Sequence, residues 1–178
     1  MQTQIGNCVV EIVQGDVSRQ HVDVIVNAAN SRLAGGGGVD GAIHRRGGPE
    51  IMNETDVKYP QGCPTGSAVL SGAGNLSAKF IAHAVGPVWR GGSRGEAELL
   101  TSAYERSLAL AEEQGCESIA LPALSTGAYG YPIEKAARVT LSTVRDFAER
   151  AQSLKRIRVV LFDEPAHRVF VGVWSEMN

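Results

Sequence analysis

The sequence predicts an α/β protein with helices on both faces of one largely parallel sheet. Short apolar, β-branched runs alternate along the chain with segments of helical periodicity, which is typical of this fold class. Several runs are apolar at every position, as expected for strands that are buried on both faces. The chain has 178 residues without a linker, an internal repeat or a low-complexity tract, so we expect one domain over residues 1–178.

Six apolar runs are predicted to form strands, and four other segments are predicted to form helices. The third helix has the clearest apolar stripe, close to the 3.6-residue period, and Pro132 suits its first position. The predicted strands are Cys8–Val13, Val22–Ala28, Ala68–Ser71, Phe80–Val85, Ser118–Leu121 and Ile157–Phe162. The predicted helices are Val39–Arg46, Glu96–Gln114, Ile133–Ala151 and Ala166–Glu176.

Composition and charge argue against several classes of function. The formal net charge is -2, so no basic field over the whole protein would attract nucleic acid. No stretch approaches the roughly 20 apolar residues of a membrane helix, and the first residues do not resemble a signal peptide, so we expect no membrane association. Cys8, Cys63 and Cys116 lie far apart without CxxC spacing, which fits free thiols in a reducing, cytoplasmic setting. The histidines show no metal-ligand spacing, so no metal site is expected.

Glycine is the unusual component of the composition. There are 21 glycines in 178 residues, where roughly 7% is average. Seven of them lie between Gly35 and Gly48, and they form neither a period-three repeat nor a Gly/Ser tract. Clustered glycine in a compact domain indicates a backbone that comes close to another group.

Two segments share the order strand, glycine loop, helix. Val22–Ala28 leads into Gly35–Gly38, and Ser118–Leu121 leads into Ser125–Gly130. In a parallel sheet, both loops would leave the strand ends at one rim, where such folds bind ligands. Helix N-termini and free N–H groups at that rim suit phosphate. Two such loops therefore predict a diphosphate or a nucleotide as the ligand.

Two further glycine patterns match enzyme motifs only formally. Gly36–Gly41 fits GxGxxG, which leaves a nicotinamide dehydrogenase as an alternative. However, the loop that precedes these glycines is long, and no convincing acidic residue at a strand end follows about 20 residues later. Gly91–Gly95 fits GxSxG, but Pro87–Arg90 separates it from the strand, whereas a nucleophile elbow follows a strand directly. We expect a polar loop there.

Polar side chains at the predicted rim are candidates for chemistry, and each has a structural alternative. Asn27 and Asn30 could hold sugar hydroxyls or simply form a turn. Asp40 could accept from a ribose hydroxyl or a water, or cap the helix beside it. Asp16, after the first strand, could cap a helix or accept from a base amino group, and composition does not choose between these roles. Phe162 could stack on a base or belong to the core.

Two histidines and a tyrosine complete the set of candidates. His44 falls one helical turn after Asp40 on the same face, where a structural hydrogen bond competes with a role in the chemistry. His83 lies inside a strand pattern and is expected to be a core histidine. Tyr129, in the second glycine loop, could pack on the face of a ribose.

Taken together, these motifs resemble the macrodomain family, and their order and spacing resemble its MacroD-type subgroup. The resemblance runs from about residue 10 to about residue 164. Each motif is loose by itself, but the combination is highly specific. The motifs are Gly15–Val17, Val24–Asn30, Gly35–Arg45, Cys63–Gly66, His83–Trp89 and Pro122–Pro132.

The resemblance implies a three-layer α/β/α domain with a mixed central sheet and an ADP-ribose cleft along one rim. By position, Asp16 would accept from the adenine amino group with Val17 beside it, and Phe162 would contact the adenine. His44 would support the site, and Asn27 would be among the substrate-binding residues. The diphosphate loop would comprise Ser125, Thr126, Gly127, Ala128 and Tyr129, with Gly36, Gly37 and Gly38 approaching from the other side.

The MacroD-type subgroup hydrolyses ADP-ribosyl esters and O-acetyl-ADP-ribose, so the resemblance implies an enzyme. Asn30 would hold the distal ribose, Tyr129 would pack on it, and Asp40 would orient or activate water near the ester. The expected partners are ADP-ribose, its esters and mono-ADP-ribosylated proteins, and no cofactor is needed. A reader module that binds ADP-ribose without turnover is the competing hypothesis. The sequence shows no evident coiled coil or spare apolar stripe, so a monomer is expected.

Overall fold

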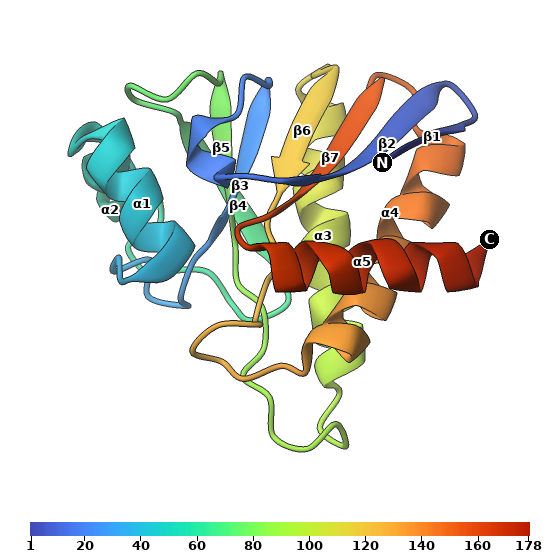
Figure 1. Ribbon diagram of the computed structural model, residues 1–178. Coiled ribbons are helices and arrows are strands. Elements are labelled where there is room, and N and C mark those ends of the chain that lie inside the picture. The colour runs from blue at the N-terminus through green and yellow to red at the C-terminus, as the bar shows by residue number, and fades with distance from the viewer.

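The computed structural model describes residues 1–178 and contains one seven-stranded mixed sheet in the order β1-β2-β7-β6-β3-β5-β4 (Figure 1). Strands β2, β7, β6, β3 and β5 run parallel, whereas β1 and β4 pair antiparallel at the two edges. This confirms the predicted α/β class and the mixed, largely parallel sheet. The strands are β1 (Gln2–Ile5), β2 (Cys8–Gln14), β3 (Val24–Ala28), β4 (Ala68–Gly72), β5 (Phe80–Ala84), β6 (Ser118–Leu121) and β7 (Arg156–Leu161).

Helices cover both faces of the sheet (Figure 1). Successive strand residues face opposite sides, and this alternation divides the core in two. Val24 and Val26 join the cluster beneath α3, α4 and α5, while Ile25 joins the cluster beneath α1, α2 and a short 3-10 helix, η1. The helices are η1 (Val17–Arg19), α1 (Gly38–Gly47), α2 (Glu50–Lys58), α3 (Glu96–Glu113), α4 (Ile133–Arg150) and α5 (Glu164–Met177). None of them is both long and apolar enough to cross a membrane.

All six predicted strands and all four predicted helices are present, with ends that shift by at most two residues. The prediction missed β1 and α2. Strand β1 has the sequence QTQI and alternates between exposed and half-buried positions at the sheet edge, so it lacks an apolar run. Helix α2 buries only Ile51 and Thr55, so its apolar stripe is too thin to recognise.

The parallel strands bring their carboxyl ends to one rim of the sheet. Strands β3 and β6 are hydrogen-bonded neighbours, with Val24 opposite Ile119. The loops that follow them therefore leave on the same side, at the lower edge of the sheet in Figure 1. The ends of β2 and β7 lie at this rim too, because both strands are parallel to β6. The predicted meeting of the two glycine loops at one rim is confirmed.

Candidate active site

Asp40 is a nearly buried carboxylate in the first turn of α1, with 5% of its surface exposed. Its Oδ1 accepts a hydrogen bond of 2.8 Å from Asn27 Nδ2 and lies 3.2 Å from His44 Nε2. Gly37 is the N-cap of α1 and no side chain caps the helix, so the capping alternative for Asp40 is wrong. The other carboxylate oxygen, Asp40 Oδ2, is close to the glycine loop, since a Cβ added at Gly36 would lie 3.6 Å from it. One carboxylate oxygen is thus held inside the protein, while the other faces the glycine loop.

Asn27 lies behind Asp40 rather than at the surface. Its side chain is fully buried in β3, and Nδ2 donates to Asp40 Oδ1 and lies 3.1 Å from His83 Nδ1. Both neighbours of the amide nitrogen therefore lie inside the protein. Any effect of Asn27 on a ligand must pass through Asp40. His83 is 2% exposed, as expected for a core histidine.

Asn30 closes the turn that precedes the glycine loop. Its Nδ2 donates to the carbonyl oxygen of Gly35 over 2.9 Å, and its Oδ1 accepts from the backbone N–H of Ala34 over 3.1 Å. The turn-forming role considered for this residue is confirmed. The amide keeps one further hydrogen and one further lone pair, so its role toward a ribose stays a prediction.

Gly41 fixes the distance between the glycine loop and α1. A Cβ added there would lie 2.8 Å from the carbonyl oxygen of Gly36, which is closer than a real Cβ approaches backbone. The glycine excess near residue 40 therefore has two causes. Gly36, Gly37 and Gly38 are exposed at the rim, whereas Gly41 lets the loop lie against the helix.

We expect Gly41→Ala to lower both the melting temperature and the activity, because the added methyl group must push the Gly36 carbonyl away from α1. The matched control is Gly172→Ala in α5, where a Cβ meets nothing within 4 Å. That change should raise stability by about 1 kcal/mol through helix propensity. Thermal melts of both variants check this prediction. Equal stabilisation by the two alanines would contradict it.

The second glycine loop begins with a strained serine. Ser125 has φ of 67°, in the left-handed region that residues other than glycine rarely adopt. It is 9% exposed, and its Oγ has no hydrogen-bond partner. Two backbone bonds enforce the turn, from Tyr131 N to the oxygen of Ser125 and from Gly130 N to the oxygen of Gly127. Strain of this kind is concentrated at ligand-binding segments.

Tyr129 and Tyr131 have different surroundings. Tyr129 is half-buried, and its carbonyl oxygen accepts from the backbone N–H of Trp89 over 2.8 Å. Tyr131 is buried and packs its ring on Trp89, with 4.7 Å between the ring centroids. Of the two rings, Tyr129 is the one available to a ligand, and Thr126 steadies the loop by donating to the carbonyl oxygen of Ala123.

Asp16 and Phe162 stand at the ends of the neighbouring strands β2 and β7. Asp16 caps η1, since its Oδ1 accepts from the backbone N–H and the hydroxyl of Ser18 over 2.8 and 2.6 Å. Burial opposes ionisation of Asp16, but those two bonds and the nearby Arg46 and Arg19 outweigh it and hold its pKa below the ordinary value. Phe162 is 78% exposed, so the core alternative is wrong for this ring. The capping role of Asp16 is confirmed, and its contact with a base stays a prediction, as does that of Val17, which is buried.

The GxSxG segment is a loop held by a buried carboxylate that the sequence did not reveal. Glu96, the first residue of α3, accepts from the backbone N–H groups of Arg90, Gly92 and Arg94 over 2.9, 2.8 and 2.6 Å. The hydrogen bond from Arg90 has the largest effect on the pKa of Glu96. Together the three bonds outweigh burial, which raises that pKa, and lower it to about 2. The expectation of a polar loop rather than a nucleophile elbow is confirmed. A buried acid directly after a glycine-rich loop is the signal that was missed.

We expect Glu96→Gln to lower the melting temperature at pH 7. Because the folded-state pKa is depressed, the stabilising effect of the carboxylate is complete above its ordinary pKa of 4.5 and is lost as the pH falls toward about 2. The difference in melting temperature between the variant and the unmutated protein should therefore shrink as the pH falls from 4.5 toward about 2. Melts between pH 2 and pH 7 measure it, with the exposed Glu98→Gln as control. A difference that does not depend on pH would contradict the prediction.

The fold and the site define an α/β domain whose parallel strands end at a rim with two glycine loops, a held carboxylate and an exposed aromatic ring. Residues 26–140 match the model of the family described as Macro domain, and the chain belongs to this family. The dinucleotide-binding alternative for Gly36–Gly41 is therefore wrong.

Individual relatives cover almost the whole chain. The chain is 50% identical over 170 residues to an O-acetyl-ADP-ribose deacetylase of Salmonella typhimurium, covering 94% of this chain and 95% of that one. The macrodomain of Oceanobacillus iheyensis with ADP has a TM-score of 0.94 and 37% identity, covering 99% of this chain and 95% of that one. A variant of that macrodomain with ADPR also has a TM-score of 0.94, with 36% identity over 99% and 97% of the two chains.

Proposed function

We propose that this protein is an ADP-ribosyl ester hydrolase that deacetylates O-acetyl-ADP-ribose. A water oxygen adds to the acyl carbon, the bond from that carbon to the ribose oxygen breaks, and the ribose oxygen takes up a proton, giving acetate and ADP-ribose. The observation that carries the proposal is the geometry of Asp40, whose Oδ1 is fixed by Asn27 while Oδ2 faces the glycine loop. A carboxylate held in this way can orient a water for attack. The relative of that name and the structures with ADP and ADPR support the same assignment.

The same chemistry extends to proteins that carry mono-ADP-ribose on Asp or Glu side chains. In these substrates an ester again joins an acyl carbon to a ribose oxygen, so the attacking water and the leaving oxygen are unchanged. Hydrolysis would release ADP-ribose and restore the carboxylate of the target. The glycine loop at the rim is exposed, which leaves room for a protein acceptor beside the reacting ester.

Residues along the rim divide between catalysis and binding in this proposal. Asn30 and Asp40 act at the ester, and the exposed ring of Phe162 contacts the adenine with Asp16 accepting from its amino group. His44 supports Asp40. The other proposed substrate-binding residues are Val17, Asn27, Gly36, Gly37, Gly38, Ser125, Thr126, Gly127, Ala128 and Tyr129, of which the buried Asn27 acts through Asp40.

We propose that the protein works as a monomer in the cytoplasm. Its three cysteines are free and buried, which suits a reducing compartment. The few large exposed apolar side chains come from separate parts of the chain, namely Met1, Val57, Val88 and Phe162. Light scattering at micromolar concentration tests the oligomeric state.

Turnover and binding measured on the same preparation test the proposed activity. Purified protein is incubated with O-acetyl-ADP-ribose, and ADP-ribose is quantified by chromatography, while calorimetry gives the affinity for ADP-ribose. We expect both binding and turnover. Tight binding of ADP-ribose without release of acetate would instead establish a reader module.

A further inference from the structure

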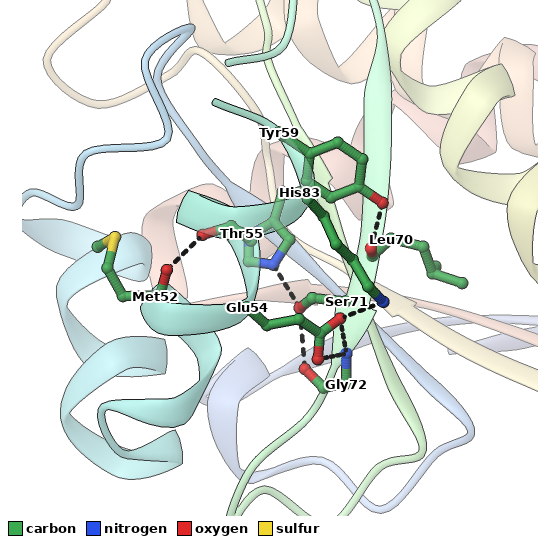
Figure 2. Close-up of polar contacts among 9 residues, drawn as sticks. Met52, Glu54, Thr55, Tyr59, Leu70, Ser71, Gly72 and His83 are labelled. Carbon is green, nitrogen blue, oxygen red and sulfur yellow. Dashed lines mark hydrogen bonds and ion pairs between the residues drawn. The ribbon is translucent and has the colours of Figure 1, made fainter. Parts of the chain in front are cut away.

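A chain of buried polar side chains runs through the sheet to Asp40. Ser71 in β4 lies 2.7 Å from Nε2 of His83 in β5, and His83 Nδ1 lies 3.1 Å from Asn27 Nδ2 in β3. Asn27 in turn donates to Asp40 Oδ1 over 2.8 Å. The sheet register explains the alignment, because Asn27 is directly opposite His83. Figure 2 shows the outer end of this chain, where His83 points at Ser71.

The contacts at both ends of this chain assign the proton of His83 to Nε2. The Asp40 carboxylate can only accept, so the amide nitrogen of Asn27 faces it, and the same nitrogen lies 3.1 Å from His83 Nδ1. The hydroxyl of Ser71 donates to the carbonyl oxygen of Gly72 over 2.8 Å, so toward His83 it can only accept (Figure 2). His83 therefore donates from Nε2, and its Nδ1 carries a lone pair. Nδ1 is then an acceptor for the amide of Asn27.

The orientation of Asn27 follows from its two neighbours. Its amide nitrogen stands between two acceptors, the lone pair of His83 Nδ1 and the carboxylate of Asp40. Its Oδ1 is buried without a partner. A reversed amide would direct oxygen at both acceptors and lose both hydrogen bonds. The unpaired oxygen is therefore the consequence of an orientation that His83 and Asp40 impose.

We propose that His83 is a positioning residue for hydrolysis: as an Nε2–H tautomer it orients Asn27, which fixes Asp40 Oδ1 and leaves Oδ2 directed at the glycine loop. This inference rests on the proposed function, because it assumes that Asp40 orients the attacking water. His83 itself is buried, and its ring nitrogens face Asn27 and Ser71 rather than Asp40. Its contribution is transmitted through two hydrogen bonds to the carboxylate.

The surroundings of His83 keep its ring neutral. Burial, aided by the nearby His44, lowers the pKa of His83 to about 4, and the opposing effect of Glu54 is smaller than either. The Glu54 carboxylate is already occupied, since it accepts from the backbone N–H of Gly72 (Figure 2). It also forms an ion pair with Lys58. The centroid of the His44 ring is 6.4 Å from that of His83. At neutral pH the lone pair on Nδ1 thus remains available to Asn27.

Two substitutions separate positioning from packing at position 83. In His83→Asn, the new Oδ1 is as many bonds from Cβ as Nδ1 is, so the acceptor for Asn27 is kept while the contact with Ser71 is lost. In His83→Gln, the terminal group reaches the place of Nε2, so the contact with Ser71 is kept while the acceptor is lost. We expect His83→Asn to keep kcat within about threefold and His83→Gln to lower it about 10-fold, with affinity for ADP-ribose unchanged in both. If His83 has a purely structural role, His83→Gln should retain more activity than His83→Asn, because glutamine fills more of the buried space.

A second pair of variants tests the tautomer without altering the histidine. Ser71→Ala removes the acceptor that holds the proton on Nε2, and we expect it to lower kcat severalfold. Ser107→Ala is the matched control, because Ser107 is equally buried, donates to a backbone carbonyl and lies in α3 away from this chain. This pair decides the question if a substitution at His83 prevents folding. The ¹⁵N shifts of the His83 ring should show the Nε2–H form in the unmutated protein.

The outcomes distinguish this inference from the proposed function. If the unmutated protein binds ADP-ribose without turnover, the proposed function fails. If it turns over and His83→Gln is as active as His83→Asn, or Ser71→Ala matches Ser107→Ala, then His83 does not position Asp40. In an Asn27→Leu background, changes at His83 should have no further effect on kcat, because the link to Asp40 is already broken.

Discussion

Asp40→Ala should lower the turnover of O-acetyl-ADP-ribose at least about 100-fold, the scale expected when a group that orients the reacting water is lost. The affinity for ADP-ribose should change only modestly. The reason is geometric: Oδ1 is occupied by Asn27 and His44, so Oδ2 is the oxygen left for a water near the glycine loop. Alanine removes that acceptor without touching the loops that would hold the diphosphate.

The control for this prediction is a substitution that keeps the shape of the side chain. Asp40→Asn can keep an oxygen toward Asn27 Nδ2, so the protein should fold normally, but an amide replaces the carboxylate that would accept from water. Single-turnover kinetics and calorimetry of both variants separate chemistry from binding. Turnover that survives in Asp40→Asn would remove Asp40 from the mechanism, and a loss of affinity equal to the loss of turnover would make it a binding residue.

The architecture could be predicted because hydrophobic periodicity reports burial, and burial defines the inner strands and long helices. It could not be predicted where burial is slight. Strand β1 lies at the sheet edge with polar residues, and α2 packs only two side chains into the core. Hydrophobic periodicity does not predict the order of the strands in the sheet either, because that order depends on pairing between strands that are far apart in the sequence.

The candidate site could be predicted as a set of residues but not as an arrangement. Motif positions identify Asn27, Asp40 and His44, and the structure brings these three side chains together. The sequence did not show that Asn27 points inward, because all positions of a strand buried on both faces look alike. His83 was expected only as a core residue, yet its register opposite Asn27 makes the two side chains partners. A polar side chain within a buried strand needs a hydrogen-bond partner. Asn27 and His83 are both polar residues in buried strands, and this shared feature could have predicted that they contact each other.

A carboxylate at position 27 should be the most destabilising single-atom change near the site. Asn27→Asp replaces the amide nitrogen, which donates to Asp40 and to His83, by an oxygen that can only accept. The position is fully buried, so the new charge would stand beside the Asp40 carboxylate without water. We expect a loss of about 3 kcal/mol at neutral pH, the scale of an uncompensated buried charge, which corresponds to a Tm lower by roughly 6 to 12 °C.

This loss should shrink as the pH falls, and that dependence separates charge from packing. Burial beside Asp40 raises the folded-state pKa of the introduced acid above its unfolded value, so the folded state gains a proton first and stability recovers toward acid pH. Asn27→Leu is the matched control, since it breaks the same hydrogen bonds with no added charge and its loss should not recover in this way. Melts of both variants from pH 5 to pH 8 make the comparison. Parallel curves for the two would show that the hydrogen bonds of Asn27, and not the electrostatics beside Asp40, dominate the stability of this part of the protein.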